Sequence, residues 1–135
     1  MHELNYKLEG DIILVCKTKG YGYVIEGFEE DRKLFYRTCG LERICGYELE
    51  INLSLEPAEA KRILDDIVDN LLIGFKLEDC SITSELTGAP VYLKQYKSRY
   101  PKFDNEICYR VIFSDENYLL PMHRLCDEVY KAQLD

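Results

Sequence analysis

The sequence lacks any apolar stretch long enough to cross a membrane. None of its segments approaches the ~20 consecutive apolar residues that a bilayer-spanning helix needs. The first residues also lack the apolar core of a secretory signal peptide. We therefore expect a cytoplasmic protein that has no membrane partner.

The sequence also lacks an excess of positive charge. Its 135 residues include 17 lysines and arginines against 25 aspartates and glutamates, so the formal net charge is −8. Because binding to phosphates needs a basic surface, this balance argues against duplex nucleic acid as a partner. Hydrophobic residues make up 47% and charged residues 31% of the chain, a mixture typical of a globular protein. The length predicts a single domain over residues 1–135.

Closely spaced pairs of metal ligands are missing as well. Zinc sites usually place two cysteines about two to four residues apart, and no two of the six cysteines here have that spacing. Most of the cysteines lie in apolar runs, where a thiol packs as a small hydrophobic side chain. His123 and Cys126 form an isolated H-x-x-C pair near the C-terminus. We therefore predict reduced cysteines, no metal and no cofactor.

Short apolar runs and alternating patterns predict several strands. The segments are 12–17, 21–25, 33–39, 47–53, 91–96 and 108–113. The 47–53 segment alternates most cleanly, with apolar side chains on one face and Glu48, Glu50 and Asn52 on the other. This period of two predicts a sheet with one face in contact with water.

A 3.6-residue periodicity predicts one long helix over residues 57–73. Pro57 suits the first helical turn, and Gly74 is a natural end. We expect Ile63, Leu64, Ile67 and Leu71 to be buried against Leu49, Ile51 and Leu53.

A second helical spacing follows Pro121. Met122, Leu125, Cys126 and Val129 recur at this spacing, which predicts a short C-terminal helix. The predicted fold class is therefore α+β, with a mostly antiparallel sheet, one long amphipathic helix packed on one face and a short C-terminal helix.

The 35–74 segment resembles a bacterial family of small proteins, the domain of unknown function 4262. The residues that carry the resemblance are Phe35, Thr38, Gly40, Leu41, Gly46, Glu48, Leu49, the 50–53 strand, the helix from Pro57, and later Leu120 and Pro121. The chain departs from the family pattern at three positions. Arg37 replaces a tyrosine, Tyr47 replaces a histidine that a proline follows, and Met122 replaces an aromatic residue. The resemblance implies no established activity.

Two segments without acidic residues suggest a site for an anionic ligand. The 12–25 and 91–103 segments both interleave tyrosines with basic residues. Tyrosine stacks on a base, and lysine or arginine holds a phosphate. We expect the two segments to lie close together and to form one site, from Lys19, Tyr21, Tyr23, Arg37, Lys94 and Tyr96. The plainer alternative is a sheet edge with half-buried tyrosines, where lysines prevent aggregation.

No catalytic residue can be assigned from the sequence. A Cys–His nucleophile would need His123 or His2 beside a cysteine, and no local pattern supports one. Eleven tyrosines in an acidic chain suit a recognition surface. We therefore expect a small non-enzymatic binding or interaction protein with a protein partner. The alternatives are a binder of a small phosphorylated ligand such as a nucleotide and, with the least support, a small hydrolase.

Overall fold

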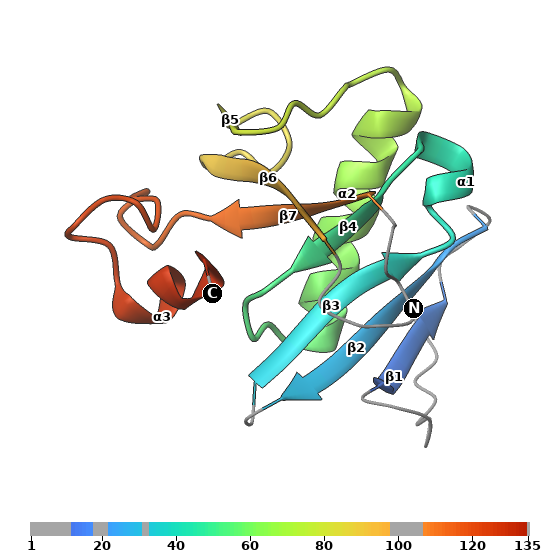
Figure 1. The fold of residues 1–135 in the computed structure, drawn as a ribbon, viewed down its shortest axis with the longest axis horizontal. Coiled ribbons are helices and arrows are strands. Elements are labelled where there is room, and N and C mark those ends of the chain that lie inside the picture. Colours follow the sequence, from blue (N-terminus) through green and yellow to red (C-terminus); the bar gives the residue numbers. More distant parts are fainter. Residues whose placement is uncertain (1–11, 18–21, 31–32, 98–106, 135) are drawn as a thin grey trace.

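The computed structural model describes residues 12–17, 22–30, 33–97 and 107–134. These residues form an α+β fold in which one long helix covers a face of a seven-stranded sheet (Figure 1). The strands are β1 (Ile12–Lys17), β2 (Val24–Glu30), β3 (Lys33–Cys39), β4 (Glu48–Ile51), β5 (Ser81–Thr83), β6 (Val91–Lys97) and β7 (Ile107–Phe113). The helices are α1 (Glu42–Cys45), α2 (Pro57–Leu72), α3 (Glu128–Lys131) and the 3₁₀ helix η2 (Ala132–Leu134). The predicted fold class is confirmed.

The strand order across the sheet is β1-β2-β3-β4-β7-β6-β5. Strands β1 to β4 follow one another as antiparallel neighbours, and β5, β6 and β7 form a second antiparallel run. The two runs join where β4 pairs with β7 in parallel. A parallel pair needs a long crossover connection, which α2 and the β5–β6 hairpin supply here. None of the helices in the described ranges is long and apolar enough to cross a membrane.

Helix α2 closes the main core, as its periodicity predicts. It begins at Pro57 and ends at Leu72, two residues before Gly74 adopts a left-handed φ of 110°. Its buried residues pack against β-strand residues that include Leu49 and Ile51. Ile63 is only partly buried, so that part of the expected contact is weaker than predicted. We call the sheet surface that packs on α2 the helix face, and the opposite surface the far face.

The prediction that Glu48, Glu50 and Asn52 face water is wrong. Their exposed fractions are 2%, 2% and 7%. The alternation itself is correct, because Leu49 and Ile51 pack on the helix face. The far face is nonetheless buried, and its polar side chains are held by the ion pairs and hydrogen bonds described below.

The C-terminal helix exists but begins later than predicted. Residues 121–127 form turns, and α3 starts at Glu128. Asp127 caps this helix, because its side chain accepts a hydrogen bond from Val129 N at 2.9 Å. Three of the four side chains that suggested a helix after Pro121 are exposed, so their spacing does not form a buried stripe. Strand β2 also extends to Glu30, beyond the 21–25 segment that the sequence predicts.

Candidate functional site

A row of charged side chains crosses five neighbouring strands on the far face. The strand register aligns Glu26 of β2, Arg37 of β3, Glu50 of β4, Arg110 of β7 and Lys94 of β6. Residues that face each other across a strand pair share one face of the sheet, with Cβ atoms about 5 Å apart. The first four side chains are at most 4% exposed. A buried row of four alternating acids and bases therefore crosses β2, β3, β4 and β7, and the more exposed Lys94 continues it on β6.

Arg110 is the best-defined member of this row. Its Nε donates to Glu50 Oε2 at 2.7 Å, and one of its terminal nitrogens donates to the carbonyl of Gln133 at 2.9 Å. The ring of Tyr96 lies over its guanidinium, with 4.0 Å from Cζ to the ring centroid. The positive charge of Arg110 is thus compensated inside the protein by a carboxylate, a carbonyl and an aromatic ring.

The structure does not bring together the four predicted anion-binding residues that it describes. Lys19 and Tyr21 lie outside the described residues. Tyr23 is buried among the core residues that pack on α2, and its hydroxyl donates to Asp65 Oδ1 at 2.7 Å. Arg37, Lys94 and Tyr96 instead belong to rows of the far face.

The expectation that the two acid-free segments lie close together is wrong for their described parts. Three strands separate β2 from β6, and four separate β1 from β6. With neighbouring strands about 4.8 Å apart, β2 and β6 are about 19 Å from each other. The sequence does not reveal this separation, because each segment has its own local pattern and neither pattern specifies the order of the strands in the sheet.

Glu48 organises the loop that joins β3 to α1. Its carboxylate accepts the hydroxyl of Thr38 at 2.6 Å and backbone N–H groups of Gly40, Leu41 and Glu42 at 3.0–3.3 Å. Gly40 adopts a φ of 100°, and a Cβ there would lie only 3.1 Å from the carbonyl oxygen of Gly22. The motif residues in this loop therefore have a structural role here.

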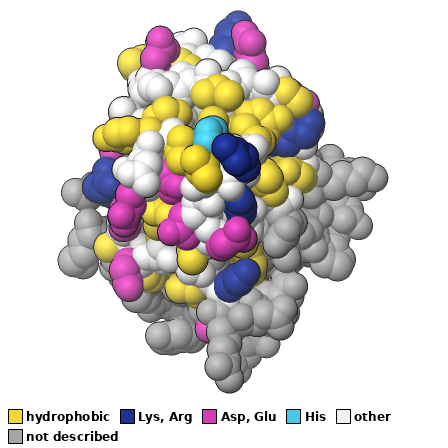
Figure 2. Space-filling view, turned by 90° about the vertical axis from the view of Figure 1, so that its left-hand side faces the viewer, with side chains coloured by type: hydrophobic (Ala, Val, Ile, Leu, Met, Phe, Trp, Pro, Cys, Tyr) yellow, Lys and Arg dark blue, Asp and Glu magenta, His cyan; other side chains and the backbone are white. Residues whose placement is uncertain are grey.

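Exposed apolar side chains gather in the C-terminal segment. Tyr118, Met122, Leu125, Val129 and Leu134 are 65%, 51%, 66%, 67% and 38% exposed. We call these five residues the C-terminal apolar surface. Figure 2 shows this side of the molecule, where hydrophobic side chains and one basic side chain lie beside the histidine drawn in cyan. Such a cluster is a typical feature of a binding surface.

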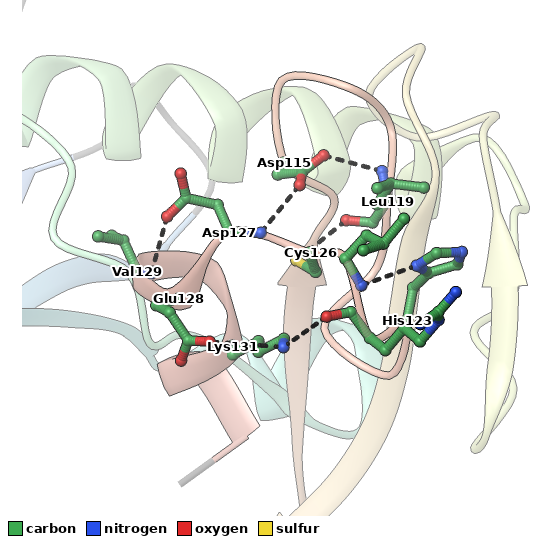
Figure 3. A network of polar contacts seen from close by, with 10 residues as sticks. Asp115, Leu119, His123, Cys126, Asp127, Glu128, Val129 and Lys131 are labelled. Atoms are coloured by element: carbon green, nitrogen blue, oxygen red, sulfur yellow. Dashed lines mark hydrogen bonds and ion pairs between the residues drawn. The ribbon is translucent and has the colours of Figure 1, made fainter.

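Asp115 holds the loop that displays this surface (Figure 3). Its Oδ1 accepts the N–H groups of Asn117 and Leu119 at 2.9 and 3.0 Å, and its Oδ2 accepts Asp127 N at 3.0 Å. These bonds keep the pKa of Asp115 below its usual value, with the Leu119 N–H as the main cause. The thiol of Cys126 donates to the Leu119 carbonyl at 3.3 Å and closes the loop from the other side.

Gln133 fastens the end of the segment to the sheet. Its side chain accepts Phe113 N at 2.8 Å and donates to the Phe113 carbonyl at 2.9 Å, as a neighbouring strand would. Its own carbonyl accepts hydrogen bonds from Asn52 and Arg110. Gln133 is fully buried. The C-terminal apolar surface is therefore fixed to the buried charge row through Arg110.

A groove opens next to this surface. It has a volume of about 380 Å³ and lies between the β3–β4 end of the sheet and α3. Its lining includes Leu34, Phe35, Leu53, Val129 and Ala132. The polar residues Asn52 and Ser54 and the exposed Lys33 and Glu128 also line it, so the wall combines apolar side chains with two neutral polar ones, one cation and one anion. The size suits one or two apolar side chains of a partner.

His123 and Cys126 have roles in the loop rather than in a shared site. His123 Nδ1 accepts the N–H of Leu125 at 3.1 Å, and burial raises the pKa of the Cys126 thiol. A raised pKa keeps the thiol protonated and unreactive. Within the described ranges, no three histidine, cysteine, aspartate or glutamate side chains are grouped to hold a metal ion.

No family model, curated protein or solved structure matches this chain. The resemblance to the domain of unknown function 4262 family therefore stays a prediction. The site has to be interpreted from its own geometry.

Proposed function

We propose that this protein is a small binding protein that recognises a protein partner through the C-terminal apolar surface. The observation that carries the proposal is the concentration of exposed apolar side chains in residues 118–134. Among the described residues, five of the nine large hydrophobic side chains that are exposed belong to this segment. Burying them against a partner would remove apolar area from water, which is the main driving force of association.

The rigidity of the segment supports the proposal. Asp115, Cys126 and Gln133 hold it by hydrogen bonds to its backbone and to β7. A surface that is ordered before binding loses less conformational entropy when the partner binds. The neighbouring groove would receive one apolar anchor, and such anchors carry much of the affinity of an interface.

A phosphorylated ligand has less support. Arg110 is compensated by Glu50, and Lys94 lies 3.9 Å from the Asp79 carboxylate. Tyr23 lies on the helix face, away from both. We retain as a proposal that the chain is a divergent member of the domain of unknown function 4262 family.

Site-specific photo-crosslinking tests the proposed function. A photoreactive phenylalanine analogue replaces Leu125 in the full-length protein inside its native cells, and Ile73 is the matched control position. Ile73 is 84% exposed and apolar but lies at the end of α2. We expect one discrete crosslinked protein from position 125 and none from position 73.

A second variant makes the result specific. Val129→Asp, introduced together with the probe at position 125, should abolish the crosslink because a charge would be buried in the interface. The proposal fails if position 125 gives no discrete product, or if Val129→Asp leaves the product unchanged.

A further inference from the structure

Cys80 differs from the other described cysteines in its exposure. It lies in the turn before β5 and is exposed, whereas Cys39 and Cys45 are half-buried and Cys108 and Cys126 are buried. These five described cysteines form no disulfide. A reagent in solution therefore reaches the Cys80 thiol more easily than the other four.

Cys80 also has a cation beside its sulfur. Lys94 of β6 donates from Nζ to Cys80 Sγ at 3.1 Å. The hydrogen bond to Cys80 and the charge of Asp79 raise the pKa of Lys94, so this side chain stays an ammonium at neutral pH. A neighbouring ammonium stabilises a thiolate. Asp79 acts in the opposite direction, and the hydroxyl of Tyr92 also interacts with the thiol.

The environments of three other thiols favour the protonated form. Burial raises the pKa of Cys45, and burial raises that of Cys126. Burial, together with the charge of Glu50, raises the pKa of Cys108 to about 12. Because the thiolate is the reactive form of cysteine, these three thiols are poor nucleophiles at neutral pH.

We propose that Cys80 is an oxidation site that reacts with hydrogen peroxide before the other described cysteines. The thiol first loses its proton to solvent. A sulfur electron pair then attacks one peroxide oxygen, so that the S–O bond forms as the O–O bond breaks. The departing hydroxide takes a proton from the Lys94 ammonium, which solvent then reprotonates. Sulfur is oxidised, peroxide is reduced, and the products are a sulfenic acid on Cys80 and water.

Trapping of the sulfenic acid tests the order of reaction. The full-length protein is treated with hydrogen peroxide in the presence of dimedone, which alkylates sulfenic acids, and each cysteine-containing peptide is followed by mass spectrometry. We expect the adduct to form on Cys80 at least about tenfold faster than on Cys39, Cys45, Cys108 or Cys126. Equal or faster labelling of any of these four overturns the proposal.

Two substitutions test the charges around the sulfur, with opposite expected signs. Lys94→Met should slow the labelling of Cys80 by about tenfold, because it removes both the cation and the proton donor. Asp79→Asn should speed it, because it removes the negative charge that opposes the thiolate. Lys131→Met is the matched control, since Lys131 is a partly exposed lysine near Cys126 and should leave Cys80 unaffected.

An unchanged rate of Cys80 labelling in Lys94→Met contradicts the role of Lys94. A slower rate of Cys80 labelling in Asp79→Asn contradicts the proposed effect of the charges around the sulfur. Circular dichroism establishes that each variant is folded. If Lys94→Met does not fold, the order of labelling in the wild-type protein and the rate in Asp79→Asn still decide the proposal.

Discussion

Replacing Arg110 while keeping Glu50 tests the buried charge row most directly. The two side chains are 4% and 3% exposed, and 2.7 Å separates Arg110 Nε from Glu50 Oε2. Arg110→Met keeps much of the apolar stem but leaves the Glu50 carboxylate without this cation. Two unit charges about 4 Å apart interact by about 4 kcal/mol at an effective dielectric constant of about 20.

The expected loss agrees with the general behaviour of buried ion pairs. Removing one partner of such a pair costs about 3–5 kcal/mol of the free energy of unfolding, because the remaining charge stays buried. Replacing both partners by apolar residues of similar size is often neutral. We therefore expect Arg110→Met to lose about 3–5 kcal/mol, and the double variant Glu50→Leu, Arg110→Met to recover most of that loss.

Urea unfolding followed by circular dichroism measures these differences. Arg62→Met provides the control, because Arg62 and Asp66 form an ion pair on α2 with side chains 63% and 56% exposed. Exposed pairs of this kind contribute about 0–1 kcal/mol. The reasoning is refuted if Arg110→Met costs no more than Arg62→Met, or if the double variant is less stable than Arg110→Met alone.

Three further changes test the core and the C-terminal segment. Leu64→Ala should lower the free energy of unfolding by about 2–5 kcal/mol in the same assay, because Leu64 is fully buried; a loss below about 1 kcal/mol contradicts the packing of α2. Gln133→Ala should cost about 1–3 kcal/mol by removing hydrogen bonds to Phe113. It should also raise amide hydrogen exchange in the 115–134 segment but not in α2, and unchanged exchange would count against the anchoring role. The pKa of Asp115 is lowered in the folded state, so its stabilising effect is complete above the usual value of 3.8 and is lost as the pH falls from there through the folded value. Asp115→Asn should therefore flatten the acid side of a stability-against-pH curve, and an unchanged curve would refute the contribution.

Local patterns predicted most of the fold. The Pro57–Leu72 helix and the Lys33–Cys39 strand each carry a complete signal in their own residues, either a 3.6-residue stripe or a compact β-forming run. The same holds for β6 and β7, whose bounds match the prediction within one or two residues. Such elements need no information from distant parts of the chain.

The far face could not be predicted in the same way. Glu50 looks solvent-exposed in sequence, because an acid that alternates with apolar residues usually faces water. Its burial depends on Arg110, which lies 60 positions away and becomes its neighbour only through the parallel β4–β7 pairing. The one available signal was Arg37, a charged residue that directly follows the apolar run 34–36 within its strand.

Long-range pairing of this kind also explains why the described residues of the predicted anion site do not come together and why an apolar surface is the stronger candidate. Acids from other parts of the chain lie beside the predicted bases: Glu26 faces Arg37 across the β2–β3 pair, and Lys94 lies 3.9 Å from the Asp79 carboxylate. Charges compensated in this way cannot attract a distant phosphate, because opposite charges a few ångströms apart produce little field outside the protein. The proposed recognition of a protein partner then depends on apolar side chains. The C-terminal segment supplies them, and Arg110 and Gln133 join this segment to the buried charge row.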